Sequence, residues 1–164
     1  MDLSEVKAFA RRAHAGQERS FTDKPYFVHP RRVGDAILEE RQDEALAAAG
    51  YLHDVLEDTG VDAPELRPVA TSQVVTIVER VCHDPDCDSK VEAIARSLGD
   101  HRPARLVKLY DRLDNVSHLD QAPGEFRARY AEETRKLLDW FEETGLVSDE
   151  EELVERIRGQ IRVD

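Results

Sequence analysis

The sequence predicts a single all-α domain of about eight helices, and three observations support this. The chain has 164 residues, which is the length of one ordinary domain. Apolar residues recur at helical spacing in block after block, and no stretch shows the sustained alternation of a half-buried strand. The 8 glycines and 7 prolines fall between these blocks, where they end helices.

The first helices are predicted from apolar spacing. One spans about 2–15, and after a loop another spans about 30–40, with a proline as its first residue. His29 would then stand just before that helix, held extended by the proline that follows it. A third helix, over 43–58, is rich in alanine and carries His53 on its inward side.

The remaining helices follow the same spacing. They are predicted at about 72–82, 88–98, 102–118, 124–144 and 148–161, and a short helix could form around 64–69. The run VVTIV at 74–78 could form a strand, but no other segment could pair with it, so we favour a helix there. We divide the chain into a domain over 1–145 and an acidic C-terminal helix within 146–164, which we expect to pack on that domain.

Composition limits the kind of protein. Hydrophobic residues make up 40% of the chain, and a chain of this length buries roughly 68–70% of its unfolded surface on folding. A core can therefore form without disulfides or structural metals. The 23 basic and 35 acidic residues give a net charge of −12, which argues against binding to a nucleic-acid polymer or to an anionic membrane. The sequence has no long apolar span and no signal-peptide pattern, so we expect a cytoplasmic protein.

Basic residues are nevertheless concentrated locally. The segment 101–115 has a positive net charge, and the loop over 17–32 contributes further arginines and a lysine. A small anion could therefore bind in a basic pocket of an otherwise acidic protein.

The strongest chemical signal is a set of histidines and aspartates from three separate segments. His53 and Asp54 are adjacent, His29 lies upstream, and Asp111 lies downstream in KLYDRLDN. Together they supply imidazole nitrogens and carboxylate oxygens, a mixture suited to manganese, iron or zinc. A lone His-Asp pair is common by chance, but three segments that supply one such set are a much more specific signal.

A weaker signal lies at Cys82 and Cys87, which flank His83 and several aspartates. A structural zinc site would need a second pair of ligands elsewhere, and the sequence has none. We therefore interpret the cysteines as ordinary thiols in a loop.

Four segments carry a resemblance to a known family: AHAGQERS, KPYFVHPRRV, AAAGYLHDVLEDT and VKLYDRLDNV. They closely resemble the HD metal-dependent phosphohydrolase superfamily, in the branch of RelA/SpoT-type hydrolases and small alarmone hydrolases that includes the metazoan SpoT homologue. The similarity covers roughly 5–143. It implies an HD-domain helical bundle that hydrolyses ppGpp or pppGpp to GDP or GTP and pyrophosphate.

The resemblance also implies residue roles. The four positions that match the manganese ligands of the family are His29, His53, Asp54 and Asp111. Its catalytic pair matches Glu57 and Asp58, which lie four residues beyond His53 and Asp54 and so can face the same water. Its substrate contacts match Arg19 and Asn115, with Lys108 and Lys90 as further candidates.

Departures from the family pattern leave the substrate open. Ser20 stands where many members have a second basic residue, His118 stands where a small hydroxyl residue is common, and the stretch 82–100 is short. An HD phosphohydrolase that acts on a 3′-phosphorylated adenine nucleotide or NADPH is therefore one alternative. A catalytically silent nucleotide sensor or adaptor is another. The sequence predicts no particular oligomeric state.

Overall fold

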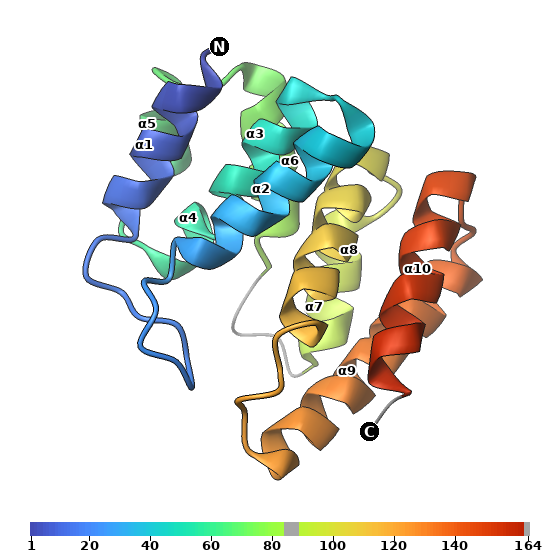
Figure 1. The fold of residues 1–164 in the computed structure, drawn as a ribbon. Coiled ribbons are helices and arrows are strands. Elements are labelled where there is room, and N and C mark those ends of the chain that lie inside the picture. The colour runs from blue at the N-terminus through green and yellow to red at the C-terminus, as the bar shows by residue number, and fades with distance from the viewer. Residues whose placement is uncertain (84–88, 163–164) are drawn as a thin grey trace.

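The computed structural model describes residues 1–83 and 89–162, which form ten helical segments and no strand (Figure 1). The segments are α1 (Leu3–Ala13), α2 (Val28–Arg41), α3 (Glu44–Leu52), α4 (Val55–Asp58), α5 (Ala63–Leu66), α6 (Ser72–Val81), α7 (Lys90–Leu98), α8 (Arg102–Val116), α9 (Gly124–Glu143) and α10 (Ser148–Ile161). Since α4 and α5 are single turns of four residues, the eight longer helices agree with the predicted number. The all-α prediction is confirmed.

Helix α3 lies at the centre of the fold. Its residues from Leu46 to Leu52 are all buried, as expected of a helix that is surrounded by others. It packs against α1, α2, α6 and α8. The run VVTIV does form a helix, α6, and its apolar residues are buried.

Helices α9 and α10 complete the bundle beside α8 (Figure 1). Leu153, Val154 and Ile157 of α10 are buried, and Glu150 at its start is completely buried beside Arg105 of α8. The C-terminal helix is thus part of the same packed structure. No helix in the described ranges is long and apolar enough to cross a bilayer.

The start of α2 corrects one prediction. The helix begins at Val28 and not at Pro30, so His29 lies in its first turn and is not extended. A proline costs little there, because the first backbone N–H groups of a helix have no partner within it. Backbone bonds from Val28 N to Pro25 O (3.1 Å) and from His29 N to Tyr26 O (3.0 Å) close this turn.

The predicted helix over 43–58 is also wrong in one respect, because it is divided at His53 and Asp54. The ring nitrogen Nδ1 of His53 lies 2.8 Å from the Gly50 carbonyl oxygen. In a continuous helix that carbonyl would accept from the backbone N–H of Asp54. The side chain thus takes the place of the backbone donor, α3 ends at Leu52, and α4 begins at Val55.

Close contact between α2 and α3 depends on a glycine. A Cβ atom on Gly34 would lie 2.3 Å from Cδ1 of Tyr51, which is completely buried. We expect Gly34→Ala to lower the free energy of unfolding by about 1–3 kcal/mol, measured by urea denaturation, because the core cannot accept the extra methyl group. Gly159→Ala is the matched control: Gly159 is also helical, but a Cβ there meets nothing within 4 Å. Equal stability of the two variants would contradict this account of the contact.

Candidate functional site

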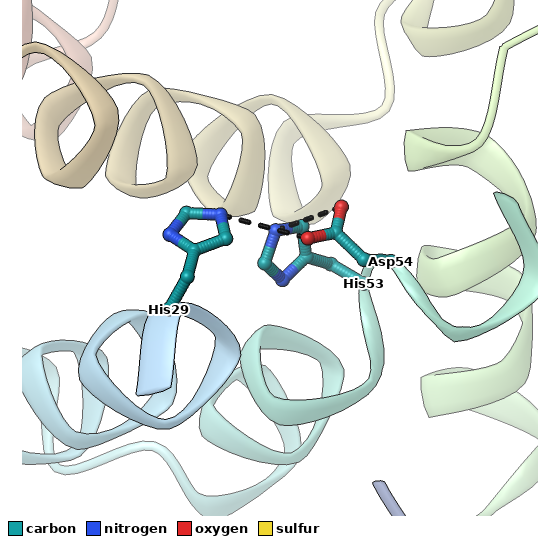
Figure 2. A group of neighbouring side chains, drawn as sticks. All are labelled: His29, His53 and Asp54. Atoms are coloured by element: carbon teal, nitrogen blue, oxygen red, sulfur yellow. Dashed lines mark ion pairs between the residues drawn. The ribbon is translucent and has the colours of Figure 1, made fainter. Parts of the chain in front are cut away.

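Three predicted metal ligands converge at the junction of α2 and α3 (Figure 2). His29 comes from the first turn of α2, and His53 and Asp54 come from the turn after α3. Nε2 of His53 lies 3.1 Å from Oδ1 of Asp54, and Nε2 of His29 lies 3.5 Å from Oδ2 of the same carboxylate. One ligand atom from each residue lies within 4.8 Å of the others, and all three residues are buried.

The fourth predicted ligand joins them from α8. Oδ1 of Asp111 lies 3.1 Å from Nε2 of His29 and 3.7 Å from Nε2 of His53. The structure therefore brings two imidazole nitrogens and two carboxylates from three segments to one point.

The residues fit a divalent cation. Nδ1 of His53 is held by the Gly50 carbonyl, which leaves Nε2 pointing into the cluster, buried and without a hydrogen bond to any described residue. A buried polar atom without a partner is costly. A cation between the two imidazoles and the two carboxylates would satisfy it, and the nitrogen and oxygen donors suit a first-row transition metal.

The electrostatics of the cluster show the same complementarity. Burial opposes a charge on His53, but the carboxylates of Asp54 and Asp111 outweigh it and raise the pKa of His53 well above its usual value. For Asp111, burial is outweighed by Lys108 and the two imidazoles, which hold its pKa well below the usual range. The carboxylates thus stay charged, and a metal would have to displace a proton from the imidazole of His53.

Asp114 orients one of the imidazoles. Its Oδ2 lies 2.6 Å from Nδ1 of His29, and Arg32 donates from Nε to its Oδ1 at 2.6 Å. With Nδ1 engaged, Nε2 of His29 is directed at the cluster, which is the usual arrangement of a metal-binding histidine. The sequence analysis did not identify Asp114, although its position three residues after Asp111 places both on one helix face.

Glu57 and Asp58 both line the cavity that contains the cluster, which has a volume of about 210 Å³. Tyr26 lies with its hydroxyl 2.7 Å from Oδ2 of Asp58 and 2.9 Å from Oδ2 of Asp54. Burial raises the pKa of Asp58, although the bond from Tyr26 opposes the shift. Tyr26 also was not identified from the sequence, even though it lies in the KPYFVHPRRV segment.

A wider cavity of about 320 Å³ adjoins the first, and Tyr26, Lys90, Asn115 and Tyr130 line both. Its wall carries the predicted substrate residues Arg19, Asn115 and Lys90, together with Ser20 and His118. Aromatic rings form another part of the wall. The rings of Phe21 and Phe126 meet edge to face with centroids 4.8 Å apart.

A chain of hydrogen bonds connects the two cavities. Arg19 donates from Nη2 to Oδ1 of Asn115 at 2.6 Å, and Asn115 donates from Nδ2 to Oδ1 of Asp111 at 2.6 Å.

Lys108 lines the smaller cavity, but its Nζ lies 2.9 Å from Oδ2 of Asp111. Burial opposes its charge, and the Asp111 carboxylate raises the pKa of Lys108 to about 12. The charge of Lys108 therefore stabilises the carboxylate of Asp111, which is one of the predicted metal ligands.

Cys82 lines neither of the two cavities. Cys82 is a half-buried free thiol, whereas Cys87 lies outside the described residues, so their relation stays untested. His83, between them in sequence, lies with Nδ1 3.0 Å from Oε2 of Glu57.

Comparisons with known proteins agree with this geometry. The chain is 31% identical over 138 residues to a probable guanosine-3′,5′-bis(diphosphate) 3′-pyrophosphohydrolase of Synechocystis, covering 79% of this chain and 18% of that one. It is 32% identical over 143 residues to a guanosine-3′,5′-bis(diphosphate) 3′-pyrophosphohydrolase of Aquifex aeolicus, covering 83% and 20%. A GTP pyrophosphokinase of Myxococcus xanthus is 33% identical over 152 residues, covering 81% and 19%. The chain thus spans about a fifth of the length of these relatives.

A solved structure matches over nearly the whole chain. It is that of a metazoan orthologue of SpoT, a protein described as hydrolysing ppGpp and acting in starvation responses. The match has a TM-score of 0.76 and 27% identity, and covers 96% of this chain and 94% of the other. The family model described as HD domain matches residues 7–141. The chain therefore belongs to the HD domain family, as its His and Asp segments indicate.

Proposed function

We propose that this chain hydrolyses ppGpp and pppGpp at the 3′ position, leaving GDP or GTP and pyrophosphate. The observation that carries the proposal is the convergence of His29, His53, Asp54 and Asp111 at a cavity that three of them line and that adjoins a wider, partly aromatic one. The names of the similar proteins support the substrate. In the reaction, the oxygen of a water molecule bonds to the phosphorus on the 3′-oxygen, and the bond between that phosphorus and the 3′-oxygen breaks.

The four ligands would hold one divalent ion, which we propose to be manganese, and that ion would supply Lewis acidity toward water and phosphate when bound. Asp114 and Asn115 support the ligands: the first fixes the ring of His29, and the second donates to Asp111. A supporting shell of this kind sets the direction of ligand atoms before a metal arrives.

Glu57 and Asp58 would handle the proton. A carboxylate on the cavity wall can orient the attacking water and accept its proton, while the leaving 3′-oxygen takes up a proton as the bond breaks. Tyr26 keeps Asp58 in place through the bond to Oδ2. The side chain of Glu57 is 30% exposed.

The wider cavity would receive the nucleoside. Arg19 and Asn115 offer polar contacts to base and sugar, the aromatic wall offers stacking, and Lys90 lies where both cavities meet and can approach a phosphate. The ligand is thus a small polyphosphate held by a metal and a few cations, which is compatible with a chain of net charge −12. We propose that it works in the cytoplasm.

The proposal is tested by incubating the purified, manganese-loaded protein with ppGpp and measuring pyrophosphate and GDP, with and without a chelator. We expect release that stops when the metal is removed. Intact ppGpp after incubation with the loaded protein would overturn the proposal.

A second candidate substrate follows from Ser20 and His118, which both line the wider cavity. A 3′-phosphorylated adenine nucleotide or NADPH could be bound there by the same machinery. A competition panel with these nucleotides separates the two, since a strong preference for ppGpp excludes the second. Turnover of any of them excludes a silent sensor.

The aromatic wall gives a separate prediction. Phe126→Ala is expected to raise KM for ppGpp roughly 5- to 150-fold, because stacking of a base on an aromatic ring is worth about 1–3 kcal/mol. The kcat value should change little, since the metal ligands are not touched. Phe126→Leu keeps most of the apolar volume without the ring, so its KM should lie between those of the wild type and Phe126→Ala. An unchanged KM in Phe126→Ala would show that the base does not stack there.

A further inference from the structure

The smaller cavity contains a histidine to which the family resemblance gives no role. His83 follows α6 and lines the cavity together with Glu57. Its side chain is 9% exposed, and its buried Nδ1 lies 3.0 Å from Oε2 of Glu57 but has no hydrogen bond to any described residue. The contact is therefore buried on the histidine side, unlike a typical surface ion pair.

Other charges around Glu57 have partners of their own. Asp58 is held by Tyr26, Lys108 by Asp111, and Arg112 by Glu133, whose Oε1 lies 3.0 Å away. Within residues 1–83 and 89–162, His83 is the side chain that lies within ion-pair distance of Glu57. Without it, a partly exposed carboxylate at the end of a four-residue helix would be free to change rotamer.

The backbone that presents His83 is fixed from two sides. The preceding residue, Cys82, donates its backbone N–H to the Val78 carbonyl at 3.1 Å and so ends α6. Its carbonyl accepts a bond from Oγ of Ser97 in α7 at 2.7 Å. The imidazole thus starts from a rigid point between two helices, and can hold a partner in a defined place.

We propose that His83 is a positioning residue whose imidazole, with Nδ1 3.0 Å from Oε2, keeps the Glu57 carboxylate directed into the cavity. Glu57 then accepts the proton of the attacking water from a fixed position, and no reorientation is needed at the moment of reaction. This inference rests on the proposed function for the role of Glu57, whereas the contact itself does not.

The kinetic test compares His83→Ala and His83→Asn in the metal-loaded protein. For His83→Ala we expect kcat for ppGpp to fall about 10- to 100-fold, because misplacing an acid–base group loses only part of its contribution to the rate. KM should change less than about threefold. In His83→Asn the amide nitrogen takes the place of Nδ1, and kcat should return to within about fivefold of the wild type. Manganese affinity measured by calorimetry should match the wild type in both.

A double variant distinguishes positioning from general damage. If His83 acts through Glu57, adding His83→Ala to Glu57→Gln should lower kcat by less than about twofold beyond Glu57→Gln alone. Effects that multiply would overturn the inference. His101→Ala is the control, because it removes a histidine that caps α8 at a distance from the cavity and should lower stability without changing kcat.

The contact can also be tested without turnover. In ¹⁵N-labelled protein, Glu57→Gln should shift the imidazole signals of His83 and leave those of His101 unchanged. If the His83 signals do not move, the inference is wrong even when ppGpp is hydrolysed. If they move but the wild type hydrolyses no nucleotide, the contact is real and the proposed function, with the role drawn from it, is wrong.

Discussion

Asp54→Asn is expected to lower kcat/KM for ppGpp by more than about 100-fold. Loss of a residue that only supports a metal ligand already costs about 10- to 100-fold, and Asp54 is a proposed ligand itself. The Asp54 carboxylate lies close to both imidazoles, at 3.1 Å from His53 and 3.5 Å from His29. The amide keeps the volume of the side chain but carries no charge, so it cannot offset the charge of a divalent ion. Manganese affinity, measured by calorimetry, should fall together with activity.

Asp139→Asn is the matched control for this loss. Asp139 is an exposed aspartate of α9 that pairs with Arg158 on the surface, where such a pair is worth about 0–1 kcal/mol. We expect unchanged activity and metal affinity. If Asp54→Asn kept full manganese-dependent turnover, the four-residue cluster could not be the metal centre.

The sequence predicted the helices well where one face is apolar. In α6 the valines and the isoleucine recur on the buried side, and burial overrides the modest helix propensity of such residues. The errors lie at polar positions. The division after Leu52 depends on a bond from a histidine ring to the Gly50 carbonyl, and apolar periodicity contains no information about such a bond.

The same limit explains which site residues were found. His29, His53, Asp54 and Asp111 were identified because they match a family pattern, and the structure brings them together. Asp114, Tyr26 and the role of His83 were not identified, because their partners are 26 to 85 residues distant in sequence. Periodicity tells which face of a helix is buried, but not which polar groups will meet there.

Glu150→Ala is expected to lower the free energy of unfolding by about 3–5 kcal/mol, because it leaves a buried arginine without its counter-charge. Glu150 is completely buried and accepts from Nε of Arg105 at 2.7 Å. It also accepts from the backbone N–H of Val147 at the start of α10. For a domain of this size, the loss corresponds to a fall in Tm of roughly 6–20 °C, measured by differential scanning calorimetry.

Glu151→Ala is the control, since Glu151 is the exposed neighbour in the same helical turn and its removal should cost no more than about 0.5 kcal/mol. Equal melting temperatures for the two variants would mean that the buried pair does not hold α10 on α8. The double variant Arg105→Met/Glu150→Leu should regain much of the loss, because an apolar pair can replace a buried ion pair.

Glu150→Ala should leave kcat for ppGpp unchanged at temperatures well below its Tm. Arg105, which loses its counter-charge, lies six residues before Asp111 on α8, or about 9 Å along the helix. Lys108 and Asn115 both contact the Asp111 carboxylate, and neither contact involves α10. Asp54→Asn should show the opposite behaviour, a folded protein without turnover. A parallel loss of kcat and Tm in Glu150→Ala would therefore mean that α10 supports the geometry of the metal cluster itself and not the stability of the bundle alone.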